Sequence, residues 1–231
     1  MPIQNSSLTM RALARLLSYP DASLREALPA IREALRSEGA LSRSRLEEVD
    51  ALAAQLAAQD PLEVEARYVE VFDRGRATSL HLFEHVHGDS RDRGPAMIDL
   101  TKTYEGAGLF LGEHELPDYL PVVLEFASTR PPQEARAFLG ETTHILNSIF
   151  SALRKRGSPY ASLLGAAIEL AGERAQAVPV APEPSLDESW AEPEAFGGCS
   201  TSGQASPSKP QPQSQPIRIV RKENASQGAA R

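Results

Sequence analysis

The longest apolar stripe of the chain predicts one long α-helix with a buried face. Its members recur three or four residues apart, at Ala135, Phe138, Leu139, Thr142, Ile145, Leu146, Ile149 and Leu153. Only an α-helix brings residues at that spacing onto one side. Cations at residues 154–156 follow the stripe and suit the negative end of a helix dipole. The segment is therefore predicted to be a helix that packs through one face.

Shorter stripes with the same period fill most of the chain on either side. Their expected starts are at Leu8, Asp21, Leu46, Asp60, Thr78 or Ser79, Pro95, Leu120 and Pro159. Asp, Ser and Thr are favourable helix caps, and Pro suits the first helical turn. No stretch alternates apolar and polar residues with β-branched enrichment, so no sheet is expected. The sequence predicts an all-α fold of roughly eight to ten helices.

Two of the predicted helices carry specific expectations about burial. The helix that starts at Thr78 or Ser79 is expected to turn Leu80, Phe83 and Val86 inward. The next helix, opened by Pro95, is expected to bury Met97, Ile98, Thr101 and Tyr104.

The composition changes near residue 178. We predict a single globular helical domain over residues 1–177 and a mostly disordered tail over residues 178–231. The tail is rich in Pro, Ser, Gln and Gly, and its apolar surface is too small to offset the entropy of ordering. Two apolar islands, at residues 190–196 and 217–220, lie within it. The lone Cys199 cannot form an intrachain disulfide, which favours a reducing compartment.

The charge of the chain excludes some classes of partner. The formal net charge is −7, and the tail contributes only −1 of it. An acidic body repels nucleic acid and mildly favours cationic partners such as a basic peptide. No apolar run is long enough for a signal sequence or a membrane span, so a cytoplasmic protein without direct membrane insertion is expected.

The most unusual chemistry lies in residues 72–94, FDRGRATSLHLFEHVHGDSRDRG. The tripeptide Asp-Arg-Gly occurs at 73–75 and again at 92–94, and the segment between holds three of the chain's five histidines. Charge at this density around one short helix is more than turn formation requires. Recognition of another protein is one interpretation of it.

A metal site is the competing interpretation. His81, Glu84 and His85 spell HxxEH, the signature of inverted zinc proteases, and a shared helix face would let both histidines reach a metal. A third ligand is missing, because His87 points roughly 200° away from His85 on a helix. A surface or packing role for these histidines is therefore preferred over a zinc-dependent hydrolase.

Catalytic patterns are otherwise missing from the sequence. It contains no glycine-rich phosphate loop, Cys/His cluster or nucleophile elbow. Glu115 and Asp118 are three apart in a proline-bounded loop, which fits the start of a helix better than an acid pair. We therefore expect no enzyme activity, no bound cofactor and no metal.

Three segments resemble a known family. They are LLSYPDASL at residues 16–24, the run at residues 60–100, and ELPDYLP at residues 115–121. They are similar to the NarJ family, the delta-type chaperones that assemble the molybdenum subunit of membrane-bound respiratory nitrate reductase. The resemblance covers essentially the whole chain, and the central run is its most specific part.

The resemblance implies a cytoplasmic, all-α redox enzyme maturation protein related to the twin-arginine proofreading chaperones. Such a protein binds the apo catalytic subunit of nitrate reductase, partly through the N-terminal segment of that subunit. It supports insertion of the molybdenum cofactor and an iron–sulfur cluster, delays membrane anchoring, and is not part of the finished enzyme. The family also accepts an apolar residue at the position of His81, which disfavours the HxxEH interpretation further.

An acidic helical body fits a helix-in-groove mode of binding, with apolar anchors and a charged rim. The residues expected to contribute to client binding are Asp73, Arg74, Arg76, Glu84, His85, His87, Asp89, Arg91, Asp92, Arg93, Tyr104, Glu115 and Asp118. The acids and His85 would meet cations of the client, and the arginines would meet acids or fix loops. A generic acidic adaptor for helices is the remaining alternative.

Overall fold

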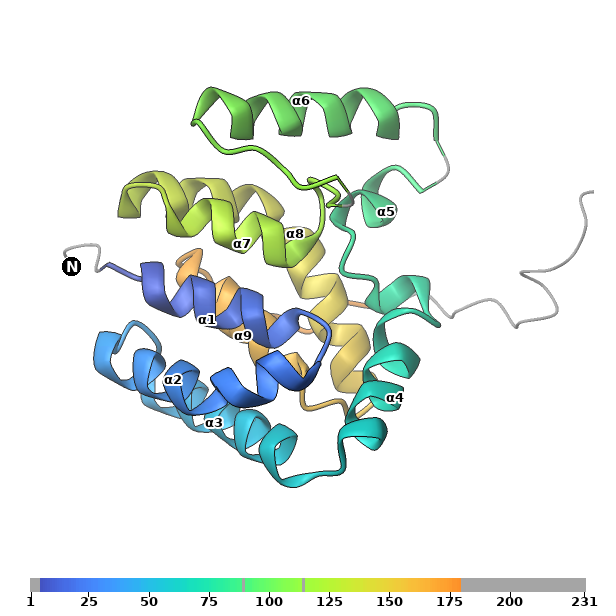
Figure 1. The fold of residues 1–231 in the computed structure, drawn as a ribbon. Helices are drawn as coiled ribbons and strands as arrows, with labels where there is room; N and C mark the ends of the chain where they lie inside the picture. The colour runs from blue at the N-terminus through green and yellow to red at the C-terminus, as the bar shows by residue number, and fades with distance from the viewer. Residues whose placement is uncertain (1–4, 89, 114, 180–231) are drawn as a thin grey trace, which may run out of the picture. The chain divides into compact units, whose positions relative to one another are not determined.

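The computed structural model describes residues 5–88, 90–113 and 115–179 (Figure 1). These ranges contain nine α-helices, one short 3₁₀ helix and no strand, which confirms the predicted all-α fold. The helices are α1 (Ser7–Leu17), α2 (Ala22–Glu38), α3 (Arg43–Ala58), α4 (Pro61–Phe72), η1 (Arg76–Thr78), α5 (Leu82–Val86), α6 (Arg93–Gly106), α7 (Leu120–Ser128), α8 (Pro132–Lys155) and α9 (Ala161–Leu170). Within the described ranges, none of them combines the length and the apolar character needed to span a bilayer.

The helix starts follow from local sequence. The Asp21 carboxylate accepts the backbone N–H of Leu24 and caps α2. The Asp60 carboxylate accepts two backbone N–H groups of the first turn of α4, and Pro61 occupies its first position. Gly39 ends α2 with a left-handed φ of 62°, a conformation that favours glycine. These are the signals from which the starts were predicted.

The core is built around α8 and α9, which pack on each other, with α1 between α2 and α7. The predicted stripe of α8 is buried through Ala135, Leu139, Ile145, Leu146, Ile149 and Leu153. Residues 161–168 of α9 are all buried, so this helix is enclosed on every side. Gly165 leaves room for the Arg45 guanidinium, since a Cβ there would lie only 2.5 Å from it.

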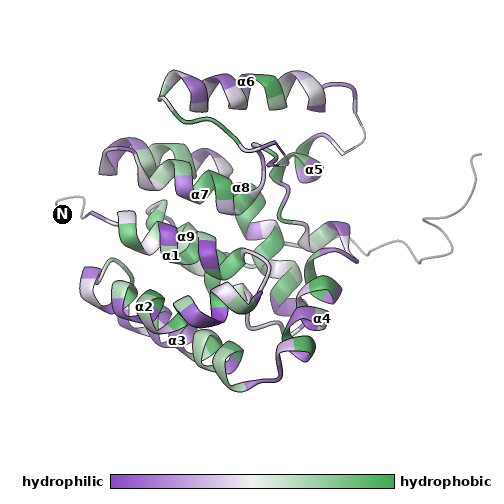
Figure 2. Ribbon diagram, viewed as in Figure 1, coloured by the Kyte–Doolittle hydropathy of each residue, from purple (hydrophilic) through white to green (hydrophobic). Residues whose placement is uncertain are grey.

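Helix α6 departs from the predicted burial. Of the expected stripe, only Tyr104 is buried, and Ile98 is 56% exposed. Phe110, just beyond the helix, is 78% exposed. Figure 2 shows hydrophobic and hydrophilic residues mixed along α6 instead of gathered on one face. The apolar spacing was present, but among the described residues only Tyr104 of this stripe is covered by its neighbours.

The start of α5 also differs from the prediction. The chain is extended at His81, which forms an isolated antiparallel bridge with Tyr119, and the helix begins only at Leu82. The N–H of Leu120 donates to Leu80 O at 2.9 Å, so this backbone is already paired and not helical. Leu82 is consequently the buried residue of α5, whereas Val86 is 52% exposed and not inward as expected.

The predicted boundary near residue 178 and the disorder of the tail stay predictions. Residues 180–231, with both apolar islands and Cys199, lie outside the described residues.

Candidate functional site

Segments far apart in the sequence meet around one hollow of about 510 Å³. It is lined by Ser18 and Tyr19 after α1, by Tyr68, Phe72 and Asp73 at the end of α4, by Ser79, Leu80 and His81, by Glu115, Leu116, Tyr119 and Pro121, and by Val122 and Glu125 of α7. All three segments singled out in the sequence therefore contribute to one place. We call it the acidic-rimmed hollow.

Aromatic rings form its floor. Tyr68 is 5% exposed, and its hydroxyl donates to Leu17 O at 2.7 Å and lies 3.2 Å from the Tyr119 hydroxyl. The Tyr68 ring meets Tyr19 edge-on at 5.7 Å and Phe72 at 4.8 Å between centroids. Burial raises the pKa of Tyr68, so the hydroxyl stays protonated. The floor is an aromatic surface suited to an apolar side chain.

Carboxylates form the rim. Asp73, Glu115 and Glu125 are exposed and line the hollow, while no Lys or Arg is among its described lining residues. Tyr19 is 45% exposed, and its hydroxyl donates to Glu65 at 2.9 Å, which adds a fourth carboxylate beside the mouth. The electrostatic potential at the opening therefore favours a cationic ligand.

Asp118 lies inside the protein, not on the exposed rim where it was expected. Its carboxylate accepts the Phe83 N–H at 3.1 Å, and its backbone oxygen accepts the Leu82 N–H at 3.0 Å. It therefore caps the start of α5 from a distant segment. The Arg93 guanidinium lies 3.8 Å from the Asp118 carboxylate and 3.5 Å from the Glu84 carboxylate. These two ion pairs connect the start of α6 to α5.

His81 faces Asp118 across 3.5 Å between Nδ1 and Oδ1. The nearby Asp118 carboxylate raises the pKa of His81, and the partial burial of the ring opposes the effect. The ring also lies 5.2 Å from that of Tyr119. His81 thus belongs to the wall of the hollow.

The histidines of HxxEH do not share a helix face. His81 precedes α5 and faces Asp118, while His85 Nε2 lies 2.9 Å from Ser79 O. Across the described ranges, no three His, Cys, Asp or Glu side chains come together in a way that could hold a metal. The geometry fits packing and loop-fixing roles for these two side chains.

Comparison with known proteins gives the family. The profile of the nitrate reductase delta subunit family matches residues 19–164. The nitrate reductase molybdenum cofactor assembly chaperone NarJ of Escherichia coli K12 is 44% identical over 159 residues, covering 69% of this chain and 67% of the relative. The probable nitrate reductase molybdenum cofactor assembly chaperone NarJ of Bacillus subtilis 168 is 34% identical over 177 residues, covering 75% of this chain and 95% of the relative. The chain belongs to the nitrate reductase delta subunit family.

A solved structure, a putative redox enzyme maturation protein from Archaeoglobus fulgidus, is 19% identical with a TM-score of 0.49, covering 72% of this chain and 91% of that one. The resemblance identified in the sequence is confirmed by the family match over residues 19–164, which is less than the whole chain. The relatives from Escherichia coli and Bacillus subtilis carry the names of nitrate reductase molybdenum cofactor assembly chaperones, which agrees with the predicted family.

The thirteen predicted site residues occupy several environments in this family member. Asp73 and Glu115 line the acidic-rimmed hollow, whereas Tyr104 is buried and donates its hydroxyl to Pro117 O at 2.8 Å. Partly exposed positions on or beside α5 and at the start of α6 are held by Glu84, His85, His87 and Arg93. Exposed positions are held by Arg74, Arg76, Arg91 and Asp92. Asp89 lies outside the described residues.

The sequence prediction missed the aromatic floor. Tyr19, Tyr68, Phe72 and Tyr119 were not among the predicted site residues, although all four lie within the three segments that carry the resemblance, at residues 16–24, 60–100 and 115–121. Glu125 was missed as well, because an exposed Glu on a helix has no distinguishing pattern. The shared segments were the available signal for these four aromatic residues.

Proposed function

We propose that this chain is a dedicated chaperone for the catalytic subunit of respiratory nitrate reductase. It binds the subunit in its apo form, partly through the N-terminal segment of the subunit, in the cytoplasm. It supports insertion of the molybdenum cofactor and an iron–sulfur cluster and delays attachment to the membrane anchor. Membership of the delta subunit family and the names of the curated relatives support the maturation role.

The acidic-rimmed hollow carries the proposal for where the client binds. An amphipathic helix offers an apolar anchor and flanking cations, and the hollow offers an aromatic floor beneath Asp73, Glu115 and Glu125. Apolar contact would supply most of the affinity, and charge would set the orientation and the association rate. Tyr104 and Asp118 are buried, so in this proposal they shape the site without touching the client.

Calorimetric titration with a peptide of the client's N-terminal segment tests the site. Glu125→Gln removes one rim charge at a side chain that lines the hollow, and Glu141→Gln removes an exposed charge from α8. We expect weaker binding with a smaller salt dependence for Glu125→Gln, and wild-type behaviour for Glu141→Gln. Equal affinities for both variants would place the client elsewhere.

Specificity separates a dedicated chaperone from a generic acidic adaptor. The tagged chain is used for pull-downs from cells with and without the nitrate reductase catalytic subunit. A dedicated chaperone recovers that subunit as the main partner and recovers little when it is missing. Recovery of many unrelated helical proteins in both cases would favour the adaptor.

A further inference from the structure

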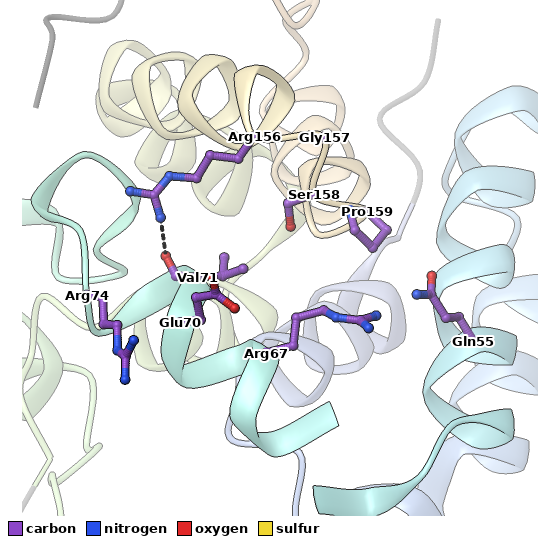
Figure 3. A pocket seen from close by; sticks show the side chains of 9 residues that line it. All are labelled: Gln55, Arg67, Glu70, Val71, Arg74, Arg156, Gly157, Ser158 and Pro159. Carbon is purple, nitrogen blue, oxygen red and sulfur yellow. Dashed lines mark hydrogen bonds between the residues drawn. The ribbon is translucent and has the colours of Figure 1, made fainter. Parts of the chain in front are cut away.

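A second hollow, of about 860 Å³, lies beside a neighbouring face of α4 (Figure 3). Arg67 and Val71 of α4 line it, about 100° round the helix from Tyr68 and Phe72 of the acidic-rimmed hollow, and Arg74 lines it from the turn that follows α4. Gln55 of α3, Glu70 of α4 and the α8–α9 turn, residues 156–159, complete it. One helix therefore separates two hollows with different linings.

The charge of this second hollow opposes that of the whole chain. Arg67, Arg74 and Arg156 line it against the single carboxylate of Glu70, although the chain carries a net charge of −7. Arg156 donates to Val71 O at 3.3 Å, which places its guanidinium against the end of α4. Arg67 donates one N–H to Gln59 at 3.0 Å and has further donors in its fork. A local cationic surface on an acidic protein favours anionic ligands.

The cations are spread out and do not converge. In Figure 3 the Arg67 side chain extends toward Gln55, the Arg156 side chain extends toward the end of α4, and Glu70 lies between them. The hollow also adjoins another of about 530 Å³, which shares Gln55 and residues 157–159 and is lined by Arg154 and by Glu48, whose carboxylate is paired with Arg45. We call the combined depression the basic groove, formed by Glu48, Gln55, Arg67, Glu70, Arg74, Arg154 and residues 156–159.

We propose that the basic groove binds an acidic segment of a partner protein in an extended conformation. In an extended chain, alternate side chains point to the same side, so carboxylates at every second position can meet successive arginines. Such a segment can pass Glu70 with an uncharged residue, whereas a compact phosphate group would meet one guanidinium and lie close to that carboxylate. The separate directions of the guanidinium groups therefore favour a peptide over a phosphate-bearing small molecule.

A polar side chain in the groove fits a peptide backbone. Gln55 supplies an amide, with a donor and an acceptor, at the junction of the two hollows. A peptide backbone carries both donors and acceptors and can satisfy such groups. This inference does not depend on the proposed function, because the groove shares no lining residue with the acidic-rimmed hollow.

The test uses the full chain and a fluorescent peptide of about ten residues with Glu at alternate positions. A matched peptide with Gln in place of Glu is the neutral control. Fluorescence anisotropy in ~50 mM salt should show binding of the acidic peptide alone. We expect Arg74→Glu and Arg67→Glu each to lower the affinity for the acidic peptide at least about fivefold, and Glu70→Gln to raise that affinity.

Arg43→Glu makes the same charge change on α3, at a side chain that is 93% exposed, and should leave the affinity within about twofold. Circular dichroism of each variant confirms its fold. Equal losses in Arg43→Glu and Arg74→Glu would reduce the binding to long-range attraction and overturn the proposal. Displacement of the acidic peptide by inorganic pyrophosphate at a comparable concentration would make the groove a phosphate site, which also overturns it.

Discussion

Asp118 accepts the backbone N–H of Phe83 from a position thirty-five residues further along the chain. The bond satisfies a donor at the start of α5, and the backbone oxygen of Asp118 satisfies a second one from Leu82. The same carboxylate faces His81 and Arg93. One buried aspartate therefore positions the wall of the acidic-rimmed hollow, α5 and the start of α6.

Replacing Asp118 should destabilise the protein without a large loss of packing volume. Asp118→Ala leaves the Phe83 N–H without its acceptor, and we expect a loss of about 2 kcal/mol in the free energy of unfolding. Asp118→Asn keeps an acceptor oxygen and should lose less. Urea denaturation measures both, with Asp99→Ala, at a side chain 77% exposed, as the control. Stability of Asp118→Ala equal to that of the control would contradict this role.

The contact between His81 and Asp118 should make stability depend on pH. The pKa of His81 is raised in the folded state, so its contribution is fully present below the unfolded value of 6.5 and is lost as pH rises through the folded pKa. Wild type should therefore lose stability relative to His81→Leu as pH increases above about 6.5. Denaturation of both proteins across this range tests it. A stability difference that stays constant with pH would show that His81 does not couple to folding.

Replacing a core leucine and replacing a surface leucine should change the free energy of unfolding by very different amounts. Leu146 in α8 is fully buried, and Leu146→Ala should cost about 2–5 kcal/mol because a cavity replaces its contacts. Leu62 in α4 is 74% exposed, and Leu62→Ala should change stability by less than about 0.5 kcal/mol. Chemical denaturation of the two variants provides the comparison. Similar losses for both would argue against the arrangement of α8 in the core.

Helix α6 should open more readily than the core helices. It buries only Tyr104, whose hydroxyl donates to Pro117 O, and its first residue reaches Asp118. Backbone amides in α6 should exchange with deuterium faster than those in α8, and Tyr104→Phe should speed exchange in α6 while leaving α8 unchanged. Mass spectrometry of the exchanged peptides measures both. Equal protection of α6 and α8 in wild type would contradict the prediction.

The parts of the fold that depend on local pattern were predictable from the sequence. The α8 stripe and the Asp60 cap at the start of α4 use residues three or four apart, and both occur as predicted. The predicted start of α5 was wrong because the backbone around residue 80 pairs with residues 118–120. Local spacing of apolar residues does not encode such a contact. The burial of Asp118 was missed for the same reason, since an Asp between proline and tyrosine in a short loop carries no sign of a distant partner.

The candidate site was predictable as a set of segments and not as a set of side chains. Its segments were identified by resemblance, and the structure brings them around one hollow. Charge density drew attention to Arg74 and Asp118, yet Arg74 lines the basic groove and Asp118 is buried. The aromatic floor carries no such concentration of charge. In the sequence, Tyr68 and Phe72 belong to an ordinary apolar stripe of a helix, and only the fold shows that Tyr19 and Tyr119 contact Tyr68.

The pairing of residues 80–82 with residues 118–120 also sets an order of events during synthesis. The ribosome releases α1 to α4 first, and those helices can begin to pack as soon as they emerge. The N-terminal amides of α5 find their acceptors only after residue 118 has left the exit tunnel, and Glu125 follows later still. A nascent chain that stops short of α7 therefore holds Tyr19, Tyr68 and Phe72 without the segment that completes their hollow.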